Sequence, residues 1–394
     1  MFSFENNVCR EGTGNMKGAM EKRLPEGSVS LWGAEMDYPT APCVCKALAD
    51  FAENGIYGFT LSSEIYTDII CKWMARMRRA DVDPGWIVPV MGTVYSLCTA
   101  LRAFTEEGDG VIIQSPSYFR FGSAVERNRR TLVTNPMTEE KGIYHLDFVD
   151  LETKMADPHN KLMILVNPHN PTGRVFTEAE MSRIGELADR YGVVVFCDEI
   201  FAETAQPGHG FRPYACLNGK GITCFSLGKS FNFTGVSQAN LLIPDPALRE
   251  QYILQRDRDH YGSIDPFFYN AVLAAYSEDG AAWLRAMNAH TAENHALIAE
   301  TLRREMPLLS LSPLEGTFVA WLDCRRLGLD DDALQRFFEE EALLFADPGA
   351  EYGASGFYRW NIATPSANIR KALKVLKAAY DRHYSTEEDT KWIS

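Results

Sequence analysis

In the first two thirds of the chain, short apolar runs alternate with longer stretches in which apolar residues recur every three or four positions. Short apolar runs bounded by turn residues are typical of buried strands, and the longer period is typical of helices packed on one face. Strands that alternate with helices indicate a parallel sheet, so the pattern predicts an α/β fold. The runs begin at Ile87, Val111, Leu162, Gly192 and Ile222.

The clearest strand–helix–strand unit spans Leu162 to Phe201. An apolar run ends in the turn NPHNPTG, and a helix follows in which Thr177 and Glu180 form a capping box. The next apolar run, GVVVF, leads directly into Asp198. Ligands of parallel sheets bind beyond the carboxyl ends of the strands, so Asn170 and Asp198 are expected beside one crevice.

A lysine follows a third run, in the stretch CFSLGKSFN from Cys224 to Asn232. Taken alone, Lys229 reads most simply as a solvated loop lysine, since lysine is rarely buried without a partner. With Asn170 and Asp198 at neighbouring strand ends, however, an amine, an amide and a carboxylate converge. Pyridoxal 5'-phosphate needs an amine for a Schiff base, a carboxylate for its ring nitrogen and a donor for its phenolate oxygen.

Three motifs resemble the fold type I pyridoxal phosphate enzymes, the aspartate aminotransferase superfamily: NPHNPTG (167–173), CDEI (197–200) and SLGKSFN (226–232). The resemblance covers roughly residues 30–383. It implies a large domain with a mainly parallel seven-stranded sheet between helices, and a smaller α+β domain. We expect residues 1–45 to form an N-terminal arm and part of the small domain, 46–275 the large cofactor-binding domain, and 276–394 the C-terminal small domain.

The resemblance also implies roles for individual residues. Lys229 would carry the cofactor and act as the catalytic base, with Asp198 at the ring nitrogen and Asn170 at the phenolate oxygen. Backbone N–H groups at a helix N-terminus bind phosphate, which suits the segment after the strand at Ile87. The further expected cofactor contacts are Gly92, Thr93 and Val94 in this phosphate cup, Ser226 as a hydroxyl donor, Tyr118 stacked on the ring, and Phe201 near the phenolate oxygen.

Several positions depart from the family pattern. Gly228 stands where a second serine is common, and Ser237 and Gln238 stand where transaminases keep a phosphate-binding arginine. Phe59 replaces a tyrosine that reaches the partner subunit's cofactor phosphate in the family, which leaves Tyr57 as a substitute candidate. The missing arginine is more typical of the superfamily's lyases than of its transaminases.

Substrate contacts are expected from three residues. Arg359, in GFYRWNIAT, matches the arginine that receives the substrate α-carboxylate, and the alternative is a surface arginine in an alternating strand. Asn170 is expected to contact the substrate as well as the cofactor. Asp37 lies in LWGAEMDYPTAP, which is similar to the W-x-A-D-M-D-F motif of the MalY/PatB branch, the cystathionine β-lyase-like carbon–sulfur lyases. Asp37 serves either as a substrate contact or to pin a strand end.

Composition limits the other possibilities. The formal net charge of −14 argues against a nucleic-acid partner, and no apolar run is long enough to cross a membrane. The nine cysteines and eight histidines show no metal-ligand spacing, so we expect no metal. The polar first thirty residues read as an arm over the surface or over a partner. A helix at 62–79 is expected to bury Ile65, Ile69, Trp73 and Met77.

The sequence therefore predicts a cytoplasmic, homodimeric pyridoxal phosphate enzyme that acts on small amino acids, with active sites at the subunit interface. The favoured reaction is carbon–sulfur β-elimination from cystathionine or another cysteine S-conjugate, which yields a thiol, pyruvate and ammonia. An aminotransferase is the enzymatic alternative. A regulatory or binding protein that keeps the cofactor fold is the alternative from another class, although intact Asn170, Asp198, Lys229 and Arg359 speak against it.

Overall fold

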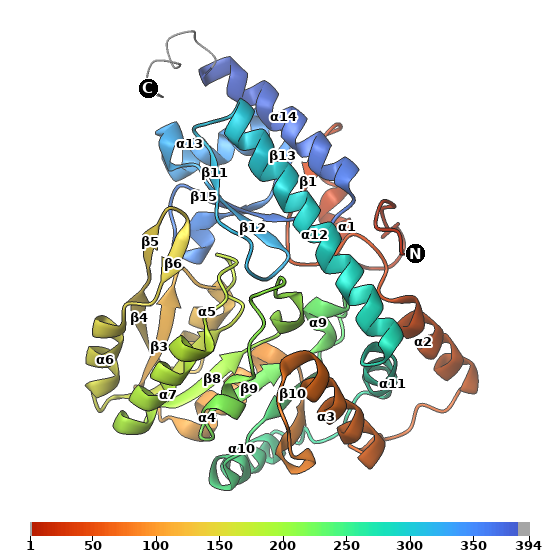
Figure 1. The fold of residues 1–394 in the computed structure, drawn as a ribbon, viewed down its shortest axis with the longest axis vertical. Helices are drawn as coiled ribbons and strands as arrows, with labels where there is room; N and C mark the ends of the chain where they lie inside the picture. The colour runs from red at the N-terminus through yellow and green to blue at the C-terminus, as the bar shows by residue number, and fades with distance from the viewer. Residues whose placement is uncertain (1, 385–394) are drawn as a thin grey trace.

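The computed structural model describes residues 2–384, and its centre is a seven-stranded sheet (Figure 1). Neighbouring strands run parallel except at β10, which is antiparallel to both of its neighbours. The predicted α/β fold with a mainly parallel seven-stranded sheet is confirmed. In order across the sheet the strands are β2 (Ile87–Val90), β10 (Ala239–Leu242), β9 (Ile222–Phe225), β8 (Val194–Asp198), β7 (Asn160–Val166), β3 (Gly110–Ser115) and β4 (Thr131–Pro136).

Helices cover both faces of this sheet because its strands are apolar on both sides. Successive side chains of a strand point to opposite faces, so Ile164 and Leu165 of β7 belong to two different core clusters. The capping box of α7 forms as predicted, with Thr177 and Glu180 bonding to each other's backbone. The helices are α3 (Glu64–Arg78), α4 (Thr93–Phe104), α5 (Phe119–Arg127), α6 (Phe148–Ala156), α7 (Glu178–Tyr191), α8 (Tyr214–Leu217), α9 (Leu227–Ser230) and α10 (Pro246–Arg258).

A second, four-stranded sheet lies above the first in Figure 1, and the long helix α12 (Glu278–Glu305) runs alongside both parts. A separate core cluster joins Val29 and Leu31 to residues between 298 and 380. The chain therefore returns to its beginning to complete this part of the molecule. Its elements are β11 (Ser310–Leu311), β12 (Val319–Asp323), β15 (Phe357–Asn361), β14 (Asp347–Pro348), α13 (Asp331–Arg336), α14 (Ser366–Tyr384), and β1 (Val29–Ser30) paired with β13 (Leu344–Phe345).

Three further elements lie outside the two larger sheets. Helices α2 (Pro42–Asn54) and α11 (Pro266–Ala275) pack against each other beside α12. The hairpin of β5 (Thr138–Glu140) and β6 (Ile143–His145) extends toward the four-stranded part. The domain boundaries at residues 45 and 275 stay a prediction, and the predicted tail 385–394 lies outside the described residues.

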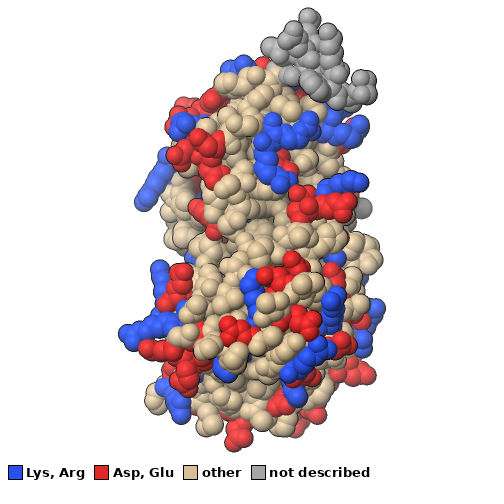
Figure 2. All heavy atoms as spheres, turned by 90° about the vertical axis from the view of Figure 1, so that its left-hand side faces the viewer, with Lys and Arg blue, Asp and Glu red and all other residues tan. Residues whose placement is uncertain are grey.

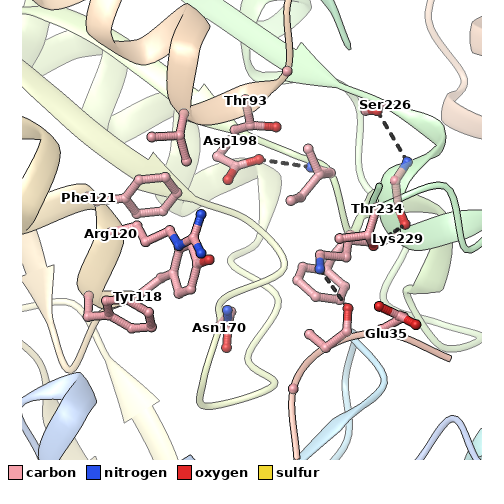
Figure 3. A pocket seen from close by; sticks show the side chains of 18 of the residues that line it. Glu35, Thr93, Tyr118, Arg120, Phe121, Asn170, Asp198, Ser226, Lys229 and Thr234 are labelled. Atoms are coloured by element: carbon pink, nitrogen blue, oxygen red, sulfur yellow. Dashed lines mark hydrogen bonds between the residues drawn. The ribbon is translucent and has the colours of Figure 1, made fainter. Parts of the chain in front are cut away.

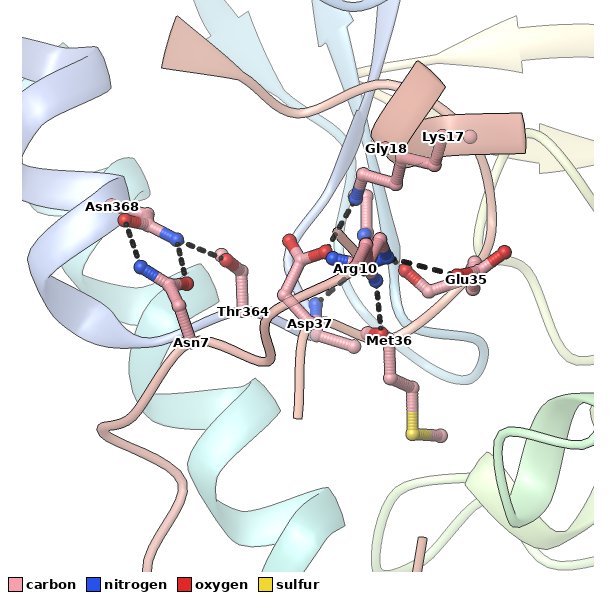
Figure 4. A network of polar contacts seen from close by, with 12 residues as sticks. Asn7, Arg10, Lys17, Gly18, Glu35, Met36, Asp37, Thr364 and Asn368 are labelled. Carbon is pink, nitrogen blue, oxygen red and sulfur yellow. Dashed lines mark hydrogen bonds and ion pairs between the residues drawn. The ribbon is translucent and has the colours of Figure 1, made fainter. Parts of the chain in front are cut away.

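The N-terminal segment is docked against the molecule by buried charges (Figure 4). Asp37 accepts a hydrogen bond from the Lys17 ammonium of α1 (Met16–Glu21) at 2.6 Å and pairs with Arg10 at 3.0 Å. Arg10 also donates to the Met36 carbonyl at 2.8 Å. A buried lysine without an acidic partner would be costly, so this pairing fixes the position of α1.

The predicted buried face of helix α3 is confirmed in part, because Trp73 is fully buried and Ile69 and Met77 pack partly buried against the same core. Ile65 is 67% exposed, whereas Tyr66, Ile70 and Trp73 are fully buried. Among the predicted residues Ile65 alone is exposed, because the core-facing side of the helix is centred on Tyr66, Ile70 and Trp73. Ile65 is one of five exposed apolar side chains in this part of the chain, which we call the 56–65 surface and which are Ile56, Tyr57, Phe59, Leu61 and Ile65.

The charges on the face shown in Figure 2 are mixed. Lysine and arginine side chains alternate with acidic ones on either side of a largely uncharged band, and no continuous basic stripe crosses this face. Among residues 2–384, no helix has the length and apolar character needed to span a bilayer. Within the same residues, no three His, Cys, Asp or Glu side chains gather as a potential metal site.

Candidate active site

A cavity of about 1030 Å³ opens at the carboxyl ends of β7, β8 and β9 (Figure 3). Parallel strands bring these ends to one edge of the sheet, which explains why residues far apart in sequence meet here. The four-stranded part contributes Asp347, Glu351 and Arg359, and the N-terminal segment contributes Lys17 and Glu35. Ten residues predicted for the site line the cavity: Gly92, Thr93, Val94, Tyr118, Asn170, Asp198, Phe201, Ser226, Lys229 and Arg359.

Lys229 lies in α9, the short helix that follows β9, and its amine points into the cavity. Burial, and secondly the positive charge of Arg359, lower the pKa of this amine to about 8. Its Nζ donates to the Ala34 carbonyl at 2.6 Å and lies 5.8 Å from the centre of the Phe201 ring. A lysine that is partly neutral near pH 8 can attack a carbonyl group.

Asp198 ends β8 and is 3% exposed. Its Oδ1 accepts a hydrogen bond from the Ile200 N–H at 3.1 Å. Burial raises the pKa of this carboxyl to about 7. A cation placed beside the carboxylate would lower its pKa again, so the site favours a ligand with a protonated nitrogen at this point.

The raised pKa of Asp198 predicts how the cofactor-free protein responds to pH. Between the ordinary carboxyl pKa of 3.8 and about 7, the folded protein holds a proton here that the unfolded chain releases. The free energy of unfolding therefore falls as pH rises through this range. Three pKa units correspond to roughly 4 kcal/mol, so Asp198→Asn should stabilise the cofactor-free protein near pH 8 by at most that amount.

Urea unfolding near pH 8 and about pH 5 measures this difference, which should shrink at the lower pH. Asp189→Asn, at an exposed site on α7, is the matched control and should change the midpoint little at either pH. A stabilisation by Asp198→Asn of the same size at both pH values would contradict the proposed origin.

Arg359 is held by two neighbours. Its Nε and one terminal nitrogen donate to Asp347 Oδ2 at 3.1 and 2.7 Å, and the other terminal nitrogen donates to Asn170 Oδ1 at 2.9 Å. All three side chains are buried. Because Arg359 occupies the carbonyl side of the Asn170 amide, the Nδ2 group of Asn170 remains as the donor for a ligand.

The expected phosphate cup lies where β2 meets α4. Gly92 precedes the helix with φ of +57°, a conformation that favours glycine, and Thr93 is the first helical residue. The first N–H groups of a helix have no partner within it, so they are available to an anion. Ser226 presently donates its hydroxyl to the Gln238 carbonyl at 2.6 Å, and Gln238 in turn donates to the Tyr261 hydroxyl at 2.8 Å.

Two predicted site residues do not line the cavity. Asp37 is buried against Lys17 and Arg10, which agrees with the alternative that it pins a strand end, and its contact with a substrate stays a prediction. Tyr57 is 55% exposed, and its hydroxyl donates to the Ala52 carbonyl at 2.8 Å. It lies with Phe59 in a second, smaller hollow, and its contact with a partner subunit's cofactor stays a prediction.

The structure also shows cavity residues that the sequence did not suggest. Asp347 holds Arg359, while Glu35 and Glu351 add carboxylates to the lining. Arg120 enters from the beginning of α5, on the same side as Tyr118 (Figure 3). Its position two residues after the predicted stacking tyrosine was the one available signal for it.

The residues present fit pyridoxal 5'-phosphate. Lys229 offers an amine with a lowered pKa, Asp198 a buried acid, and Asn170 a free amide N–H. A helix N-terminus with small residues supplies an anion site within the same cavity. These groups match the aldehyde, the ring nitrogen, the phenolate oxygen and the phosphate of that cofactor.

Comparisons with known proteins agree with this geometry. The family model for aminotransferase class I and II matches residues 29–376. Cystathionine beta-lyase PatB of Bacillus subtilis is 34% identical over 385 residues, covering 96% of this chain and 99% of that protein. Protein MalY of Escherichia coli is 30% identical over 345 residues, covering 86% and 88%. The crystal structure of cystalysin from Treponema denticola, which contains pyridoxal 5'-phosphate, superimposes with a TM-score of 0.93 at 28% identity, covering 97% and 99%.

Fold and site together define a fold type I pyridoxal phosphate-dependent enzyme. The chain belongs to the aminotransferase class I and II family. The predicted family and cofactor are thereby confirmed.

Proposed function

We propose that the protein is a carbon–sulfur β-lyase that acts on cystathionine or a related cysteine S-conjugate and releases a thiol, pyruvate and ammonia. The observation that carries this proposal is the similarity to PatB over nearly the whole length of both chains. Ser237 and Gln238 at the phosphate end of the cavity are consistent with it, because the lyases of the superfamily as a rule lack an arginine there.

The residues of the cavity have distinct tasks in this proposal. Pyridoxal 5'-phosphate, when bound, supplies an electron sink for the pair of electrons released at the substrate Cα. Lys229 holds the cofactor and then removes the Cα proton through its Nζ. Asp198 keeps the ring nitrogen protonated, and Asn170 donates its amide N–H to the phenolate oxygen or to the substrate.

Arg359 is proposed to bind the substrate α-carboxylate, and Tyr118 to pack on the cofactor ring. Arginine suits the first task because its planar guanidinium pairs with both oxygens of a carboxylate. The Phe201 side chain has no hydrogen-bond donor, so only other residues of the cavity can donate to the phenolate oxygen. Removal of the Cα proton expels the sulfur substituent as a thiolate, provided that the substrate carries one.

We further propose a homodimer in the cytoplasm. The 56–65 surface is largely solvent-exposed in the single chain, with Phe59 fully exposed and Leu61 75% exposed. Exposed apolar side chains gathered within ten residues of the chain are typical of a protein interface. The nine cysteines are all unpaired, as is usual in a reducing compartment.

Product analysis separates a lyase from a transaminase. With cystathionine and no added oxo acid, the holoenzyme should form pyruvate and ammonia in equal amounts over many turnovers. A transaminase would stop after one turnover, with the amino group left on the cofactor, until an oxo acid is added. That result, without pyruvate, would contradict the proposed function and establish the alternative.

A further inference from the structure

Arg120 lines the cavity, is solvent-exposed, and has no protein partner within residues 2–384. It is the second residue of α5, and its side chain lies beside Tyr118, across the cavity from Lys229 (Figure 3). Within residues 2–384, no hydrogen bond or ion pair joins its guanidinium to another side chain or to the backbone. An arginine that lines a ligand cavity with all five donors free is suited to bind an anion.

The other cations of the cavity are already engaged. Arg359, which Asp347 and Asn170 position, is assigned to the substrate α-carboxylate in the proposed function, and Lys17 is held by Asp37. Lys229 is reserved for the cofactor in the proposed function. Among the described residues of the lining, Arg120 is therefore the cation that remains available to a further acidic group.

The charge of Arg120 acts inside the cavity. It opposes the burial that raises the pKa of Tyr118, and it contributes to the lowered pKa of Lys229. The nearby carboxylates do not neutralise it. Glu35 accepts hydrogen bonds from Arg10 and Asn15, and the charges that act on Glu351 are those of Asp347 and Arg359.

The position of Arg120 differs from that of the phosphate cup. Gly92 caps α4, which begins with Thr93 and Val94, and Ser226 caps α9, whereas Arg120 belongs to α5 on the side of Tyr118. The cavity, at about 1030 Å³, is at the upper end of the ordinary range for ligand pockets and leaves room for a long sulfur substituent.

We propose that Arg120 is a specificity-determining residue that binds a carboxylate at the far end of the substrate's sulfur substituent. This inference rests on the proposed lyase function and names its substrate class: cysteine thioethers whose leaving thiol carries an acidic group. Arg359 and Arg120 then divide the two carboxylates of such a substrate between them, one at Cα and one beyond the sulfur atom.

Two matched substrates test this assignment. S-carboxymethylcysteine and S-carbamoylmethylcysteine have nearly the same size, but only the first has a carboxylate beyond sulfur. Arg120→Gln should lower kcat/KM for the carboxymethyl compound about tenfold, the factor that 1.4 kcal/mol of binding represents, mainly through KM. The change for the carbamoylmethyl compound should stay within about twofold. Added salt should reduce the preference of the native enzyme for the carboxymethyl compound, and should leave the substrate ratio of Arg120→Gln unchanged.

Arg127→Gln is the control, because Arg127 lies in the same helix and is likewise exposed, but does not line the cavity. It should leave the ratio of the two substrates unchanged. Equal losses for both substrates with Arg120→Gln, or no loss for either, would overturn the assignment. Loss of bound cofactor from Arg120→Gln on dialysis would also overturn it, since Arg120 would then serve the phosphate.

A binding measurement separates this inference from the proposed function. Each compound's dissociation constant follows from the change in cofactor absorbance when the amino acid binds, whether or not pyruvate forms. Absence of pyruvate with the native enzyme refutes the lyase, whereas the ratio of the two dissociation constants in native and Arg120→Gln protein decides the role of Arg120.

Discussion

Replacing Lys229 with alanine is expected to abolish covalent attachment of pyridoxal 5'-phosphate and to reduce turnover by roughly 10⁴-fold or more, as removal of a reacting group does in other enzymes. Lys229 is buried in the cavity wall, and its pKa is lowered to about 8, so its neutral amine is available near that pH. We propose that this amine both holds the cofactor and moves the Cα proton. No other lysine of the lining is free, because Lys17 is paired with Asp37.

Borohydride reduction followed by peptide mapping is the direct measurement. In native protein the pyridoxyl label should appear on the peptide containing Lys229, and in the variant no lysine should be labelled. Lys220→Ala is the control, because Lys220 is exposed and forms only a 3.7 Å ion pair with Asp189. A label on any lysine other than Lys229 in the native protein would contradict the assignment.

The variant should fold, which keeps this experiment interpretable. Lys229 contributes one hydrogen bond, from Nζ to the Ala34 carbonyl, and its burial disfavours its own charged form. Alanine removes both the bond and the cost of the buried charge. The far-ultraviolet circular dichroism of the variant should therefore match that of the native protein.

The residues that could be predicted from sequence share one physical basis. Asn170, Asp198 and Lys229 each follow an apolar run, and the ends of parallel strands meet at one edge of a sheet. Local signals such as the capping box at Thr177 and Glu180 depend on neighbours three positions apart, so they can also be read directly.

Contacts between distant segments could not be predicted in this way. The pairing of Asp37 with Lys17 depends on how the N-terminal segment folds back, and it engages the Asp37 carboxylate in an ion pair. The exposure of Ile65 depends on how α3 is rotated against the core, which covers Trp73 but not this end of the predicted face. The hold of Asp347 on Arg359 depends on the register of β14 against β15, where these two residues are direct partners. Periodicity within a segment carries none of this information.

The buried ion pair between Arg359 and Asp347 determines how the role of Arg359 must be tested. Arg359→Ala would leave Asp347 as a buried carboxylate without its cation, and breaking one side of a buried pair costs about 3–5 kcal/mol of stability. A loss of activity in this variant would mix misfolding with lost substrate binding. The double variant Arg359→Gln with Asp347→Asn removes both charges and leaves polar groups of similar size to bond with each other and with Asn170.

We expect the double variant to fold and yet to lose about 30-fold to several thousandfold in kcat/KM, since losing a charged hydrogen-bonded contact costs roughly 2–5 kcal/mol. The loss should be similar for both cysteine conjugates, because both carry the α-carboxylate. Asp347→Asn alone is the control: it also breaks the buried pair and is expected to be less stable, but it keeps the guanidinium and should retain far more activity than the double variant when both are folded. Thermal unfolding of all three proteins confirms that they are folded. A double variant with kcat/KM close to that of Asp347→Asn would show that Arg359 serves the fold through Asp347 and does not bind the substrate carboxylate.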